Sequence, residues 1–149
     1  MTAEDRRSAA APGTAAEADR QARQRISAAV ERARSAGRRV MVVFTGDWCG
    51  DSKALLAALE HPLVAPLVAL GLEVVVLDAG NRDRHLALAE GWGLSYARGL
   101  PAVAVLDGDG ELVAATRQGE LASARLLSPI DVATLVHRWL PEGAGTAGG

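Results

Sequence analysis

The sequence predicts an α/β protein with a mixed four-stranded sheet, helices on both faces and one further helix in front. In the first half of the chain, β-branched runs alternate with helical patterns, which is typical of parallel strands joined by crossover helices. Two Asp-Gly steps then separate two apolar runs, which indicates an antiparallel hairpin. A helical pattern follows. From residue 39 onward the expected order is therefore β-α-β-α-β-β-α.

The helix in front is expected over residues 15–37. Apolar side chains recur there at helical spacing, with arginines and acids on the other faces, and a glycine ends the pattern at residue 37. Residues 1–14 carry no apolar period, so we expect a disordered lead. Residues 142–149 follow a helix-breaking proline and are expected to form a disordered tail. The main domain then spans residues 38–141.

Each remaining element is identified from its own pattern. The strands are short β-branched or apolar runs, and the helices place apolar side chains on one face. The last helix has the clearest start, because Ser128 precedes Pro129 and the acid Asp131 follows, as in a capped helix. The expected elements are a strand at 39–44, helices at 50–59 and 63–70, a strand at 72–77, a helix at 82–90, strands at 102–106 and 112–116, and a helix from 129.

Composition limits the kinds of function. The chain has 149 residues, of which 49% are hydrophobic and 23% charged, and its formal net charge is −2. These values fit one soluble domain and argue against a nucleic-acid partner, since proteins that bind phosphate backbones carry excess Lys and Arg. The apolar runs are too short to span a bilayer, so no membrane partner is expected. The N-terminus shows no signal-peptide pattern, and we expect a cytoplasmic protein.

Neither a metal nor a cofactor is expected. His61, His85 and His137 fall on separate expected elements without ligand spacing. Residues 107–111 lack the ligand set of a calcium loop and are interpreted as the hairpin turn. Cys49 is the only cysteine, so an internal disulfide and a cysteine-rich zinc site are both impossible. Any thiol chemistry must use Cys49 alone or with a partner molecule.

Cys49 stands where the first strand runs into its helix. The unpaired amide groups and the positive end of the helix dipole favour a thiolate there, whereas the carboxylates of Asp47 and Asp51 oppose it. Ser52 is three residues further on, so its hydroxyl is expected to share a helical face with the sulfur and to donate a hydrogen bond to the thiolate. The alternative interpretation of Cys49 is a small buried hydrophobic residue.

Two motifs make this pattern more specific. The segment Trp48-Cys49-Gly50-Asp51-Ser52 resembles the thioredoxin motif Trp-Cys-Gly-Pro-Cys, and Gly99-Leu100-Pro101 resembles the cis-proline loop of that family. Residues 80–83, 99–107 and 119–125 are similar to a bacterial thioredoxin-like subfamily whose motif is usually Trp-Cys-x-Asp-Cys. The resemblance covers residues 39–140 and implies a thioredoxin-like fold.

The chain departs from this family at two positions. Ser52 matches the second cysteine, which in the family releases the substrate from the mixed disulfide, so this intramolecular step is missing. Val43 matches a buried acid that helps to deprotonate the second cysteine. The two losses agree, because a proton acceptor is useless without its thiol and an unpaired buried carboxylate is costly. We therefore favour a natural one-cysteine protein over a laboratory Cys→Ser trap.

The resemblance implies thiol–disulfide exchange, and two hypotheses follow. In the first, Cys49 attacks a protein or small-molecule disulfide, forms a mixed disulfide and is released by an external thiol reductant. A monothiol glutaredoxin is a weaker match, because it lacks the tryptophan before the cysteine. The second hypothesis is a redox-inactive module that keeps the cis-proline groove for a peptide or partner protein. The candidate catalytic residues are Cys49 and Ser52, and the candidate substrate-binding residues are Trp48, Gly50, Asp51, Leu100 and Pro101.

Several of these residues have alternative interpretations. Pro101 is either the cis-proline packed against Cys49, with the Leu100 backbone free to pair with an extended peptide, or an ordinary trans loop proline. Trp48 is either a packing residue or a platform for substrate. Glu120 and Arg125 either form a structural ion pair or line the groove.

Overall fold

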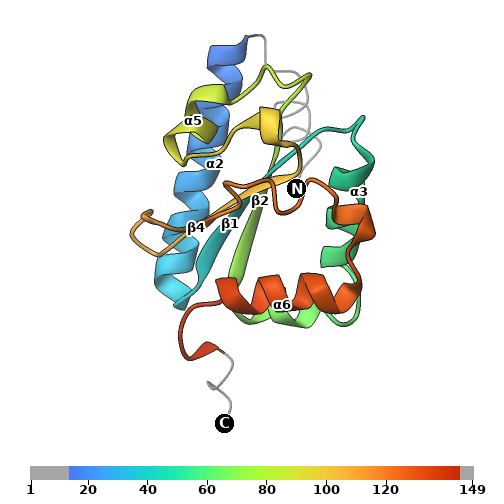
Figure 1. Ribbon diagram of the computed structural model, residues 1–149. Coiled ribbons are helices and arrows are strands. Elements are labelled where there is room, and N and C mark those ends of the chain that lie inside the picture. The colour runs from blue at the N-terminus through green and yellow to red at the C-terminus, as the bar shows by residue number, and fades with distance from the viewer. Residues whose placement is uncertain (1–13, 145–149) are drawn as a thin grey trace, which may run out of the picture.

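The computed structural model describes residues 14–144, which contain a four-stranded sheet covered by helices on both faces (Figure 1). This confirms the expected α/β fold with its mixed sheet and N-terminal helix. Most of the expected lead and tail, residues 1–13 and 145–149, lie outside the described residues. Residues 142–144 belong to a turn in which the Ala144 amide donates to the carbonyl oxygen of Pro141 (3.1 Å).

The strands are β1 (Arg39–Thr45), β2 (Leu72–Asp78), β3 (Ala102–Leu106) and β4 (Leu112–Ala115). The helices are α2 (Ala15–Ala36), α3 (Gly50–Leu59), α4 (Ala65–Gly71), α5 (Leu86–Gly91) and α6 (Pro129–Trp139), with 3₁₀ turns η1 (Tyr96–Arg98) and η2 (Ala124–Leu126).

The strand order in the sheet is β2-β1-β3-β4. β1 is parallel to β2 and antiparallel to β3, and β4 returns antiparallel to β3. The β3–β4 hairpin closes at Asp107, whose Oδ1 accepts from the amides of Asp109 (2.9 Å) and Glu111 (3.0 Å). The expected hairpin is therefore present, and β1 becomes a central strand whose carboxyl end leads directly into α3.

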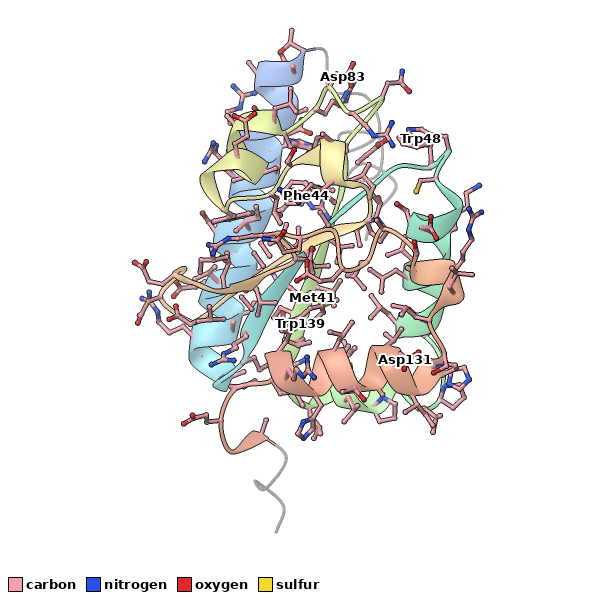
Figure 2. The ribbon with its side chains drawn as sticks, viewed as in Figure 1. Met41, Phe44, Trp48, Asp83, Asp131 and Trp139 are labelled. Atoms are coloured by element: carbon pink, nitrogen blue, oxygen red, sulfur yellow. The ribbon has the colours of Figure 1, made fainter. Side chains whose placement is uncertain are left out.

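Side chains of β1 and β3 alternate between two separate cores. Val40, Val42 and Phe44 point to the side covered by α2 and α5, where the Phe44 ring lies 5.9 Å from that of Tyr96. Met41 and Val43 point to the side covered by α3, α4 and α6. Figure 2 shows Met41 beside Trp139 of α6, away from Phe44. Both central strands are buried on two faces, and each fully buried large apolar side chain contributes about 1.5–3 kcal/mol.

α2 packs against β1 and β2 (Figure 1), and its buried side chains are four alanines and Ile26. Thr14 caps its N-terminus by accepting from the Glu17 amide (3.0 Å), and Gly37 ends it in the left-handed conformation (φ 67°). None of the helices within residues 14–144 is long and apolar enough to cross a membrane.

α6 begins as its sequence predicts. The Ser128 hydroxyl accepts from the Asp131 amide (3.2 Å), and the Asp131 carboxylate accepts from the Ser128 amide (2.9 Å). This reciprocal capping box satisfies two amides that the first turn would otherwise leave unpaired. The buried side chains of α6 then pack against the core on the α3 side.

The helix expected at residues 82–90 is wrong at its start, because α5 begins only at Leu86. Arg82 (φ 66°) and His85 (φ 60°) both have left-handed backbone conformations, which do not occur within a right-handed helix. Residues 79–85 instead form a loop, hereafter the 79–85 loop. Tyr96 holds this loop by donating its hydroxyl to the Arg84 carbonyl oxygen (2.7 Å), so a tertiary contact overrides the helical pattern.

Candidate active site

Cys49 caps the N-terminus of α3. A turn leads from β1 into the helix, and it is closed by the Cys49 amide, which donates to the Gly46 carbonyl oxygen (2.9 Å). The Cys49 backbone is extended (φ −96°, ψ 114°), and its side chain makes no capping hydrogen bond. Cys49 is half-buried and comes directly before the residues whose amides are unpaired in the first helical turn. A negative charge on the sulfur is stabilised by that end of the helix dipole.

The Cys49 thiol donates a hydrogen bond to the carbonyl oxygen of Leu100, with the sulfur 3.6 Å from that oxygen. Leu100 and Pro101 are both buried, and the peptide bond between them is cis. The loop before β3 thus meets the start of α3, although the two are about 50 residues apart. The bond requires the protonated thiol, so ionisation of the sulfur frees the Leu100 carbonyl for another donor.

Ser52 does not hold the Cys49 sulfur in the way expected. Its side chain is 1% exposed, and its hydroxyl oxygen accepts from the backbone amide of Gly46 (3.2 Å). Within the described residues, the hydrogen bond of the Cys49 thiol goes to Leu100 instead. The reason is that β1 ends at Thr45, so the buried Gly46 amide needs an acceptor from outside the sheet. Ser52 joins α3 to the end of β1.

Trp48 packs on the turn and reaches the 79–85 loop. Its indole Nε1 donates to the Gly80 carbonyl oxygen (2.7 Å), and the guanidinium carbon of Arg82 lies 4.7 Å from the centre of its ring. A β-carbon on Gly46 would stand 2.8 Å from the Trp48 Cε2 atom, so the ring occupies the space above this glycine. The side chain is still 46% exposed. Figure 2 shows Trp48 and Asp83 of the loop at the same end of the molecule.

Asp51 on the first turn of α3 is neutralised by Arg125. Its Oδ1 accepts from the Arg125 amide (3.1 Å) and lies 3.5 Å from the Arg125 Nε. The other side of this guanidinium faces Gly50, since a β-carbon there would lie 3.6 Å from Nη1. The mutual ion pair considered for Glu120 and Arg125 is wrong, because Arg125 pairs with Asp51 and Glu120 accepts from the Gln118 amide (2.7 Å). An arginine thus offsets the carboxylate that was expected to oppose a thiolate.

The structure brings the predicted residues together at the junction of β1 and α3, and it adds four that sequence reasoning did not assign to the site. Gly46, Gly80 and Arg82 position Trp48, and Arg125 pairs with Asp51. Gly80 and Arg82 stand in residues 80–83 and Arg125 in residues 119–125, two of the segments that carry the family resemblance, so the resemblance is the signal that could have indicated them. The pairing of Arg125 with Asp51, 74 positions away, has no local signal.

No metal centre accompanies this site. Within residues 14–144, no group of three or more His, Cys, Asp or Glu side chains is placed to hold a metal ion. The residues at the junction offer a sulfur, two carboxylates, two arginines and backbone groups. Their chemistry is that of a half-buried nucleophile with hydrogen-bonding groups around it.

Comparison with known proteins relates this arrangement to redox proteins. The sequence profile of a family described as Thioredoxin-like matches residues 21–108. The crystal structure of a disulphide isomerase from Xylella fastidiosa Temecula1 is similar to this chain, with 32% identity and a TM-score of 0.74. That similarity covers 78% of this chain and 89% of the isomerase chain. A search of curated proteins found no match.

Proposed function

The chain belongs to the thioredoxin-like family, and from this premise we propose that it is a one-cysteine thiol–disulfide exchange protein. The similarity to a disulphide isomerase supports exchange chemistry in general. The observation that carries the proposal is the position of Cys49, at the start of α3 and 3.6 Å from the Leu100 carbonyl oxygen. At this position the helix dipole favours a thiolate, and ionisation of the thiol ends its hydrogen bond to the Leu100 carbonyl oxygen.

The reaction proceeds in two exchange steps. The Cys49 thiolate attacks one sulfur of a disulfide, a new sulfur–sulfur bond forms, and the other substrate sulfur leaves as a thiolate. An external thiolate then attacks the substrate sulfur of this mixed disulfide, which restores the Cys49 thiolate and leaves a disulfide between substrate and reductant. Each step exchanges one sulfur–sulfur bond for another, so no further oxidant is needed. A reducing cytoplasm would supply the external thiol.

The backbone before Pro101 is the proposed docking strand for substrate. Once Cys49 is ionised, the Leu100 carbonyl has lost its thiol donor and can accept from a backbone amide of an extended substrate. Substrate docking and thiolate formation are therefore linked through one oxygen atom. The exposed indole of Trp48 offers an apolar surface beside the sulfur, and the Gly50 and Asp51 amides contribute positive potential.

The serine at position 52 determines how the mixed disulfide is released. No sulfur stands at this position, so the mixed disulfide on Cys49 is not opened from within the chain. It persists until an external thiol arrives, so the release step is bimolecular and its rate is first order in that thiol. A dithiol relative would not show this dependence.

The proposal is tested with a small symmetrical disulfide and intact-mass measurement. The wild-type protein should form a stable one-to-one adduct, added thiol should remove it, and Cys49→Ala should form none. In an insulin-reduction assay with a thioredoxin reductase system, turnover should stay near background. If Cys49 forms no adduct in the folded protein but reacts after unfolding, a redox-inactive binding module replaces this proposal.

A further inference from the structure

A cavity lies behind the 79–85 loop, on the side of the sheet covered by α2. Its volume is about 300 Å³. It opens at the carboxyl ends of the parallel strands β1 and β2, where Thr45 and Asp78 reach it, and α2 and the 79–85 loop form its walls. In open α/β sheets this end of the parallel strands is where ligands commonly bind. The proposed exchange reaction makes no use of this cavity.

Two arginines on different elements converge on the cavity. Arg25 comes from α2 and Arg84 from the 79–85 loop. Arg25 donates from Nη1 to the Val76 carbonyl oxygen (3.0 Å), and within residues 14–144 neither guanidinium has a carboxylate partner. Partial desolvation lowers the pKa of Arg25, although the residue as a whole is exposed.

The remaining polar groups leave a net positive charge. Asp78 is the acid that lines the cavity, and its Oδ1 already accepts from the Gly80 amide (2.8 Å). His85 also lines it and is 7% exposed, and its Nδ1 lies 2.7 Å from the Asp19 carboxylate. Asp19 pairs with His85 and lies outside the cavity lining, which therefore carries two arginines and one carboxylate.

The wall that carries Arg84 is firmly held. The Tyr96 hydroxyl donates to the Arg84 carbonyl oxygen (2.7 Å), and the adjacent His85 is fixed to α2 through Asp19. Burial and the nearby charge of Asp19 together raise the pKa of Tyr96, so its hydroxyl keeps its proton and continues to donate. The loop wall that carries Arg84 and the helix wall that carries Arg25 are therefore tied together through His85 and Asp19.

We propose that this cavity binds a small oxyanion, held between Arg25 and Arg84 with His85 at the wall. Guanidinium groups recognise the oxygens of phosphate and carboxylate through paired hydrogen bonds, so both are sources of the shared chemistry. A volume of about 300 Å³ admits inorganic phosphate or a short dicarboxylate and is at the lower limit of small-molecule pockets. Hydrogen bonds and charge pairing between the anion and the two arginines that line the cavity supply the affinity.

The experiment measures thermal unfolding of the full chain against inorganic phosphate and, separately, against succinate. Chloride adjusted to the same ionic strength is the reference. At a hundredfold excess over the dissociation constant, the anion should raise the unfolding midpoint by about 5–10 °C, and the shift should saturate. Arg25→Gln and Arg84→Gln should each weaken binding at least tenfold. Arg23→Gln, on the same helix but outside this cavity, should bind like wild type.

The outcomes separate clearly. A saturable shift with only one of the two anions identifies the source of the oxyanion and supports the proposal. A shift that does not saturate, or that follows chloride, overturns it, as does retention of the full shift in both Arg25→Gln and Arg84→Gln. The unfolding midpoints of the free variants and their circular dichroism show that they are folded. Adduct formation by Cys49 is measured alongside, and its failure would leave this result unaffected.

Discussion

The hydroxyl oxygen of Ser52 accepts a hydrogen bond from the Gly46 amide, 3.2 Å away, and joins the first turn of α3 to the end of β1. Ser52, which we propose stands in place of the second cysteine of the family motif, therefore has a structural task in this chain. It satisfies a buried amide at the point where the sheet ladder stops.

We expect Ser52→Ala to lower the free energy of unfolding by about 1–3 kcal/mol, because the Gly46 amide is left buried without an acceptor. Urea unfolding measures the change. Ser123→Ala is the matched control, since Ser123 is exposed and its side chain makes no capping bond; it should change stability by less than about 0.5 kcal/mol. The alkylation rate of Cys49 should stay close to that of wild type. A tenfold slower rate would show that Ser52 acts on the sulfur after all.

Gly46→Ala should displace the Trp48 indole, because the new methyl group would stand 2.8 Å from Cε2. The ring is half exposed and can swing outward, at the cost of its bond to the Gly80 carbonyl and its contact with Arg82. Fluorescence measures the result: the emission assigned to Trp48, by difference from Trp48→Phe, should move to longer wavelength. Gly91→Ala is the control, since a β-carbon there meets nothing within 4 Å. Unchanged Trp48 emission in Gly46→Ala would contradict this packing.

Arg125→Gln should slow the reaction of Cys49 with iodoacetamide at pH 7. The substitution leaves the Asp51 carboxylate without its cation on the first turn of α3, where a negative charge opposes a thiolate. The difference should shrink in 1 M salt, where the screening length falls to about 3 Å. Adding Asp51→Asn to Arg125→Gln should restore the rate. Arg138→Gln on the exposed face of α6 serves as the charge-matched control, and an equal effect there would mean that the pair acts only through net charge.

The elements that the sequence predicts well are those whose causes are local. The start of α6 follows from Ser128, Pro129 and Asp131, which are neighbours and form their capping bonds with one another. The β3–β4 hairpin follows in the same way from the turn that Asp107 closes. The family motifs add the convergence of Cys49 with Leu100, which local patterns alone would not indicate.

The features that the sequence does not predict depend on partners far along the chain. His85 is held in a left-handed conformation with Asp19 as its partner, 66 positions away, and this contact delays the start of α5. The Ser52 hydroxyl accepts from the Gly46 amide, and this need arises from where β1 ends, which the residues around Ser52 do not reveal. The pairing of Asp51 with Arg125 likewise requires η2 to lie beside α3.

Ser52→Cys restores both sulfurs of the family motif and should allow an internal disulfide with Cys49. The two positions are the cap and the third residue of one helix, which is the spacing of the dithiol motif. Sulfur is a weaker acceptor than a hydroxyl, so the Gly46 amide loses part of its bond and stability should fall by about 1 kcal/mol. Oxidation should lower the mass by that of two hydrogens, and neither thiol should remain free. The matched Ser123→Cys variant should keep its thiols.

The same variant tests whether the missing sulfur alone accounts for the missing release step. The new thiol would be buried beneath the first turn of α3, and the buried polar residues within residues 14–144 include no carboxylate that could accept its proton. Release of mixed disulfides in Ser52→Cys should therefore remain slow, and it should become faster when Val43→Asp is added. Val43→Asp by itself should destabilise the protein by several kcal/mol, because an unpaired carboxylate is placed in a fully buried position. If Ser52→Cys stays fully reduced under oxidising conditions, the geometry of the junction differs from that of dithiol relatives and the exchange proposal loses its structural basis.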